Sequence, residues 1–173
     1  MPGIDIAFHI EPLGIIFSLL ASGLWILTHI YAIGYMRGAK EKNQSRFFFF
    51  FSVSIASVMG ISFSGNLFTL FLFYELLTLI TFPLVSHKGS SEALRGARVY
   101  LSILLGTSIG FQLLGIIWIY FSIGTLDFVK GGILNGSFGS LELIILVGLF
   151  AFGIGKAALF PFHRWLPAAM VAP

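Results

Sequence analysis

The sequence has no cysteine, and charged residues make up only 10% of its 173 positions. Without cysteine, this sequence cannot supply a disulfide, a thiolate metal site or iron–sulfur ligands. A soluble domain usually carries about 25% charged residues, so the shortage of charge excludes an ordinary soluble domain. Hydrophobic residues instead account for 57% of the sequence, with a mean hydropathy of +0.98. This composition indicates an integral membrane protein.

The motifs of soluble enzymes are also absent. The sequence has no phosphate-binding loop, no cluster with metal-ligand spacing and no nucleophile–base pair, and its 20 glycines do not form a G-x-G-x-x-G motif. We therefore expect no cofactor, no metal, no catalytic site within this chain and no binding of nucleic acid.

Long apolar runs divide the sequence into candidate membrane spans, each near the roughly 20 residues that a helix needs to cross a bilayer. The runs show little alternation of polar and apolar residues, which favours helices over the strands of a barrel. We predict a single all-α transmembrane domain over residues 1–173 with five helices. The last helix is expected to be broken at Pro161. The predicted spans are residues 13–36, 47–63, 67–85, 99–120 and 141–160.

The basic residues between these spans predict an orientation. With five spans, eight of the ten basic residues lie on one side of the membrane, and Lys130 is the only one on the other. Basic loops remain in the cytoplasm, so we predict a multi-pass protein of the inner (plasma) membrane with its N-terminus outside and its C-terminus inside. The eight are Arg37, Lys40, Lys42, Arg46, Lys88, Arg95, Arg98 and Arg164.

Glu75 is the first candidate functional residue. It lies in FLFYELLTLI, residues 71 to 80, with no other charged residue within ten positions on either side. At 1.5 Å per residue it lies roughly 12–15 Å from either end of its span. An ionised carboxylate there costs several kcal/mol unless it has a partner or water. We interpret Glu75 as functional, with a structural hydrogen bond between helices as the alternative.

Lys156 is the only basic residue deep within a predicted span. Gly153 and Gly155 precede it, and glycines allow helices to approach closely or the backbone to distort. An ion pair between Lys156 and Glu75 would compensate the desolvation of both groups. The alternative is a lysine that extends to the membrane surface from a helix end.

Three histidines are open to more than one interpretation. His163, in PFHRWLP, could serve in a proton relay or lie at the membrane interface. His29 is expected to form a hydrogen bond between helices, and His87 to be a solvated loop residue. The five phenylalanines at 47–51 are expected to face lipid.

Three segments together resemble a known family: SGNLFTLFLFYELLTL, EALRGARVYL and GKAALFPFHRWLPAAMVAP. They are similar to the antiporter-like subunits of Mrp cation/proton antiporters, of respiratory complex I, and of membrane-bound hydrogenases and sulfur reductases. The likeness is strongest to the D-type subunits of Mrp antiporters. The stretch HIEPLGIIFSLLASGLWILTHIYAIGYM resembles the family's preceding segment, so the likeness covers nearly the whole chain.

The resemblance implies roles for specific residues. Glu75 matches the family's essential intramembrane glutamate, Lys156 matches the lysine of its broken helix, and the FPFHRWLP segment matches that helix break. Relatives often have a lysine where this chain has Val99, which places Arg98 one residue earlier as a candidate substitute. The sequence resembles only a partial antiporter-like five-helix repeat, so a partner chain is expected to supply the missing second repeat.

The resulting expectation is a non-catalytic subunit of a redox-driven ion pump or cation/proton antiporter. It would translocate protons or sodium ions through Glu75 and Lys156, with His163 and Arg98 as further candidates, beside other membrane subunits in the lipid bilayer. The alternative is a structural or assembly subunit with a static buried ion pair. A quinone-dependent enzyme is a third possibility, but no redox ligand or headgroup site supports it.

Overall fold

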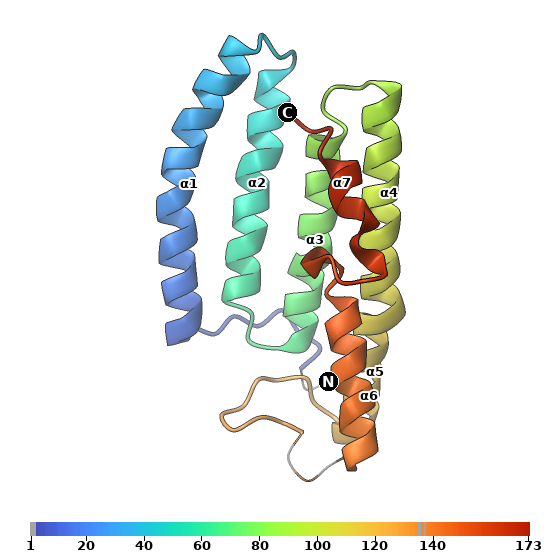
Figure 1. The fold of residues 1–173 in the computed structure, drawn as a ribbon. Helices are drawn as coiled ribbons and strands as arrows, with labels where there is room; N and C mark the ends of the chain where they lie inside the picture. The colour runs from blue at the N-terminus through green and yellow to red at the C-terminus, as the bar shows by residue number, and fades with distance from the viewer. Residues whose placement is uncertain (1–2, 135, 137) are drawn as a thin grey trace.

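The computed structural model describes residues 3–134, 136 and 138–173, and all regular elements in this part of the chain are helices (Figure 1). Four helical stretches are long and apolar enough to cross a membrane: α1 (Pro12–Gly38), α2 (Gln44–Ser62), α3 (Leu67–Val85) and the stretch Ser91–Ile123. A shorter apolar helix, α6 (Ser140–Gly153), follows them. The prediction of an all-α integral membrane protein is confirmed.

The stretch Ser91–Ile123 consists of α4 (Ser91–Thr107), the π-helical turn η1 (Ser108–Gln112) and α5 (Leu113–Ile123). It begins eight residues before the predicted span. The Ser90 side chain caps α4 by accepting a hydrogen bond from the Ala93 N–H at 3.1 Å. The first turns of α4 are polar, so a search for long apolar runs does not include them in the predicted span.

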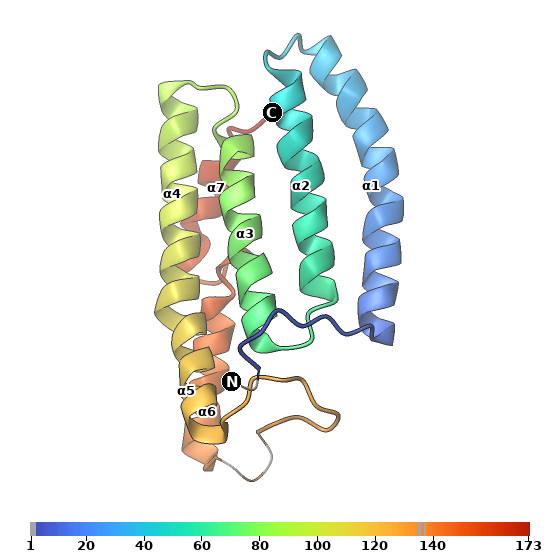
Figure 2. The same ribbon diagram turned by 180° about the vertical axis from the view of Figure 1, so that it is seen from behind.

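The four long stretches stand side by side, and successive ones are joined at alternating ends (Figures 1 and 2). In Figure 1, α5 and α6 lie together at the lower end. The short helix α7 (Trp165–Ala169) lies above α6 and packs on α4. The chain after α6 thus continues along the bundle beside α4, toward the end opposite the N-terminus.

At the end of the bundle that holds the N-terminus, three segments are joined by backbone hydrogen bonds. The Gly65 N–H donates to the Ala7 carbonyl at 2.8 Å, and the Leu67 N–H donates to the Leu126 carbonyl at 3.0 Å. Asn66 is fully buried, and its side chain caps α3 by accepting from the Thr69 N–H at 2.7 Å. The SFSGN turn is therefore a junction for the N-terminal segment and the loop after α5.

At the opposite end, the structure corrects the expectation for His87. This residue is buried, and its Nε2 lies 2.9 Å from the Lys42 carbonyl oxygen. The Arg46 guanidinium donates to the His87 carbonyl at 2.9 Å, and the Phe47 ring lies edge-on to the imidazole. The solvated-loop prediction is wrong, because the loops on either side of α2 and α3 fold against each other here.

His29 and the phenylalanine run also differ from expectation. His29 forms no hydrogen bond through Nδ1 and instead packs among Trp25, Phe48 and Phe51, with the imidazole parallel to the Phe51 ring. Phe49 is exposed on the outer face. Only part of the run therefore faces outward, since 100° per residue turns Phe48 and Phe51 toward α1 and Phe47 toward His87.

The last predicted span ends earlier than the sequence suggested. α6 ends at Gly153, and the chain continues through the 3₁₀ turns η2 (Gly155–Ala157) and η3 (Phe162–Arg164). Pro161 lies inside this irregular segment and does not end the helix. The two glycines that flank Ile154 have low helix propensity, and both pack too closely against the bundle to carry a side chain.

Candidate functional site

Glu75 lies on α3 with both carboxyl oxygens buried and without a hydrogen-bond partner. The Ser108 hydroxyl, from η1, is near enough to interact with this carboxyl. That hydroxyl donates instead to the backbone carbonyl of Leu104 at 2.8 Å, which satisfies its proton within its own helix. A buried carboxylate without a partner is costly, so Glu75 is the least compensated polar side chain of the site.

Lys156 lies in η2, where the chain after α6 enters the bundle. Its ammonium donates to the hydroxyl of Thr78 and to the carbonyl oxygen of Tyr74, the latter at 3.3 Å. It also lies 3.7 Å from the centre of the Tyr74 ring, in the geometry of a cation–π contact. The ammonium is thus held by three uncharged groups on α3, and the surface-reaching alternative does not describe it.

The two charged residues are neighbours, but they do not form an ion pair in this structure. Tyr74 and Thr78 are four positions apart and share one face of α3. Glu75 is one position after Tyr74, which turns its side chain about 100° around the helix. The site therefore holds an acid and a base that face different groups on and around α3.

Two glycines allow the Lys156 segment to reach this position. A Cβ added at Gly153 would lie 2.6 Å from the Gln112 Cβ, and one at Gly155 would lie 2.2 Å from the Thr107 hydroxyl oxygen. The Gly155 carbonyl accepts a hydrogen bond from the Trp165 indole at 2.8 Å. The break in the last helix is therefore packed against α4 and η1, as protein cover requires for irregular backbone at membrane depth.

The other two predicted residues lie outside this cluster. His163 is exposed in η3, and its ring stacks on Phe160 with the centroids 5.7 Å apart. Arg98 is exposed on α4. Neither contacts Glu75 or Lys156 in the described part of the chain.

The sequence interpretation missed the groups that surround the two charges. Thr78 is one of them, although it lies three residues after Glu75 and four after Tyr74 on a helix that is otherwise largely apolar. Ser108 is not singled out by the sequence, which presents it as one of several polar residues of its span that either line a hydrated path or pack helices together. Gln112, which is buried with Oε1 unpartnered, belongs to the same turn. Helical spacing from Glu75 could have singled out Thr78, but nothing in the sequence marks the π-helical turn.

Two family models match this chain. Residues 64–173, which include Glu75 and Lys156, match the model described as NADH:quinone oxidoreductase/Mrp antiporter, TM. The chain belongs to this family. Residues 3–48 match a second model, described as NADH-Ubiquinone oxidoreductase (complex I), chain 5 N-terminus. The predicted relationship to antiporter-like subunits is confirmed.

Curated relatives of this antiporter-like chain include subunits of cation/proton antiporters. The chain is 33% identical over 178 residues to the A/B subunit of a probable K(+)/H(+) antiporter of Rhizobium meliloti (strain 1021). It is 34% identical over 177 residues to the A1 subunit of the Na(+)/H(+) antiporter of Staphylococcus aureus (strain JH9). Each alignment covers 99% of this chain but only 17% and 21% of the relatives. These two relatives are A-type subunits, and the likeness to the D type stays a prediction.

A solved structure supports the same relationship. A chain of the membrane-bound sulfane sulfur reductase, an archaeal respiratory membrane complex, matches with a TM-score of 0.63 and 28% sequence identity. The match covers 72% of this antiporter-like chain and 26% of that one. The aligned part of this chain thus spans about a fifth of the Staphylococcus aureus relative and about a quarter of the archaeal chain. The Staphylococcus aureus relative is named as an antiporter subunit, and the archaeal chain comes from a respiratory membrane complex.

Proposed function

We propose that this chain takes part in proton or sodium translocation within a multi-subunit membrane complex, through Glu75 and Lys156. One observation carries the proposal: the buried carboxyl group of Glu75 has no hydrogen-bond partner, while the half-buried ammonium of Lys156 is bound to uncharged groups on the same helix. A purely structural site would be expected to satisfy the carboxyl group. The relatives named as antiporter subunits support this interpretation.

The proposed mechanism is electrostatic. In this structure, Lys156 is bound to Tyr74 and Thr78, and Glu75 has no direct counter-ion. Movement of the ammonium toward the carboxylate would form the ion pair and satisfy both charges. The affinity of Glu75 for a proton or a cation would therefore differ between these two arrangements. A charge change in a neighbouring subunit that shifts Lys156 would therefore drive uptake or release of the ion.

The full path is proposed to need further chains. A partner that supplies the missing second repeat would complete the route, and the energy would come from redox chemistry or antiport in the other subunits. His163 and Arg98 remain proposed participants at the ends of the path. Both side chains are exposed; His163 is titratable and Arg98 is charged. The proposed orientation places the N-terminus outside and the C-terminus in the cytoplasm.

The test is a Glu75→Gln variant in the assembled complex. We expect ion translocation by inverted membrane vesicles to fall at least about tenfold, while the amount of assembled complex is unchanged. Glutamine has nearly the same shape but cannot bind or release a proton. Glu92→Gln is the matched control, because Glu92 is exposed in the first turn of α4, away from the site.

A structural or assembly role is the second candidate function. The bonds from Lys156 to Tyr74 and Thr78 favour it, since they attach the segment after α6 to α3. Under this alternative, Glu75→Gln and Lys156→Gln would lower the amount of assembled complex. The complexes that did assemble would transport at the normal rate, and that outcome would refute the translocation role.

A further inference from the structure

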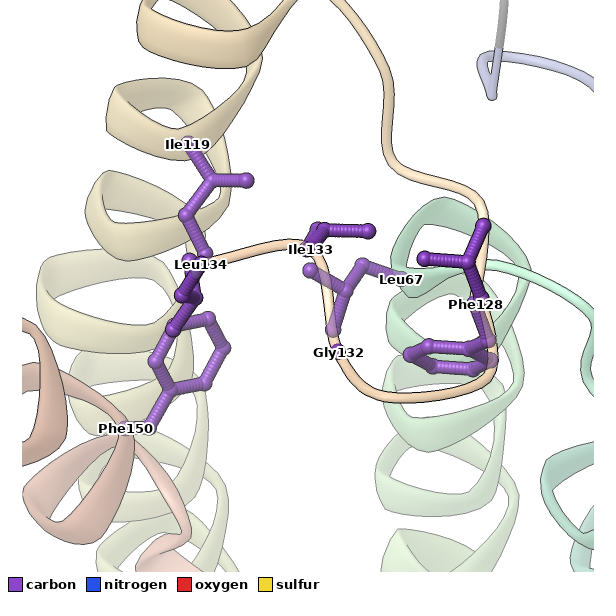
Figure 3. Close-up of a pocket in the computed structure, with 8 residues that line it drawn as sticks. Leu67, Ile119, Phe128, Gly132, Ile133, Leu134 and Phe150 are labelled. Atoms are coloured by element: carbon purple, nitrogen blue, oxygen red, sulfur yellow. The ribbon is translucent and has the colours of Figure 1, made fainter. Parts of the chain in front are cut away.

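An apolar cavity of about 310 Å³ lies at the end of the bundle that holds the N-terminus (Figure 3). Its walls come from Leu67 of α3, Ile119 of α5 and Phe150 of α6. The loop between α5 and α6 covers it with residues that include Ile133 and Leu134. None of the described residues that line the cavity has a polar side chain. Its volume lies at the lower end of the range for small-ligand pockets.

Lys130 lies on the same loop, between the lining residues Val129 and Gly132. Its side chain is exposed and forms no ion pair with any carboxylate in the described part of the chain. The two nearest carboxylates in the sequence have local partners. Asp127 accepts from the Thr125 hydroxyl at 3.0 Å, and Glu142 accepts from the Gly139 N–H at 2.8 Å. The ammonium is therefore available to an external anion.

The position of the cavity suits a lipid. α3 begins at Leu67, α5 ends at Ile123 and α6 begins at Ser140, so the loop and the cavity beneath it lie where the spans end. At this level, the hydrocarbon of a bilayer meets its charged headgroups. A cavity with apolar walls, covered by a loop that carries an exposed lysine, matches the order of groups along a phospholipid.

We propose that this cavity binds part of an acyl chain of an anionic phospholipid, whose phosphate is bound by Lys130. A polypeptide segment fits less well, because its backbone N–H and C=O groups would enter walls that offer no hydrogen bonds. The positive charge favours an anionic headgroup over a zwitterionic one. The bound lipid would fill the space between α3, α5 and α6 and hold the loop against the bundle.

The test uses the intact membrane complex in nanodiscs with photoactivatable phospholipids that carry the reactive group on the acyl chain. Mass spectrometry then locates the cross-links. We expect phosphatidylglycerol to label the loop residues 128–134 and the start of α3 more strongly than phosphatidylcholine of the same chain length. Lys130→Gln should lower the labelling by phosphatidylglycerol about fivefold, the effect of removing one interfacial cation.

Two variants separate the headgroup from the cavity. Ile133→Trp, which fills the cavity, should lower labelling by both lipids. Lys88→Gln removes an exposed lysine at the opposite end of the bundle and should leave labelling unchanged. Equal labelling by the two lipids, no effect of Lys130→Gln, or no labelling of the cavity by either lipid would each overturn the proposal.

Discussion

At the scale of single residues, the site depends on Glu75 lying one position after Tyr74 on α3, which turns the two side chains in different directions. Glu75 and Lys156 can be found in the sequence because charges are rare inside apolar spans. Their arrangement could not be predicted, because backbone carbonyls and hydroxyls that can bind an ammonium occur all along a helix. Thr78 and the Tyr74 carbonyl take the lysine, and the neighbouring carboxyl is left without it. The proposed mechanism depends on this competition between uncharged groups and Glu75 for Lys156.

Thr78→Val tests that competition. Valine keeps the shape of threonine but removes the hydroxyl that accepts from Lys156. A hydrogen bond to a charged group contributes about 1.5–3 kcal/mol, so the balance between the two positions of the ammonium should shift toward Glu75. We expect the translocation rate in vesicles to change by at least about tenfold, while assembly is maintained. Thr78→Ser retains a hydroxyl and should restore the rate; identical rates in all three proteins would contradict the prediction.

At the scale of secondary-structure elements, the irregular segment after α6 packs closely against the turn η1. The sequence indicated a break near Lys156 but assigned it to Pro161, since proline is the stronger breaker in isolation. The helix ends at Gly153 because the chain there approaches Gln112 and Thr107 more closely than any side chain would permit. Such a contact joins residues far apart in the chain, and no local pattern reports it. The π-helical turn could not be predicted either, because a single wider turn does not alter the composition of the apolar run.

Gly155→Ala tests this fit. The added methyl group would meet the Thr107 hydroxyl oxygen, which must shift to make room. Overpacking of this kind costs about 1–3 kcal/mol, so we expect a lower temperature of thermal dissociation for the purified complex. Gly148→Ala is the matched control on α6, since nothing lies within 4 Å of its added Cβ. Alanine is the better helix former, so this control should be neutral or slightly stabilising, and equal losses in both variants would contradict the prediction.

At the scale of the whole molecule, the sequence predicted the membrane class and the four long helices, because hydropathy reports burial in lipid directly. It did not predict how the ends are joined. His87 and Asn66 are buried junctions at opposite ends of the bundle, and each depends on partners from distant segments. The charges of the loops predict which end lies in the cytoplasm, because basic loops remain inside during membrane insertion. The arrangement of the helices by itself is compatible with either orientation.

The absence of cysteine makes the orientation directly measurable. Single substitutions Glu11→Cys and Lys88→Cys place exposed thiols at opposite ends of the bundle, before α1 and after α3. Because the loops with most of the basic residues should lie inside, we expect a membrane-impermeant maleimide added to intact cells to label the chain at position 11 but not at position 88. Both should react after permeabilisation, which shows that each thiol is accessible. Labelling at position 88 alone in intact cells would reverse the orientation, and the ion path through Glu75 would then have to open to the opposite sides.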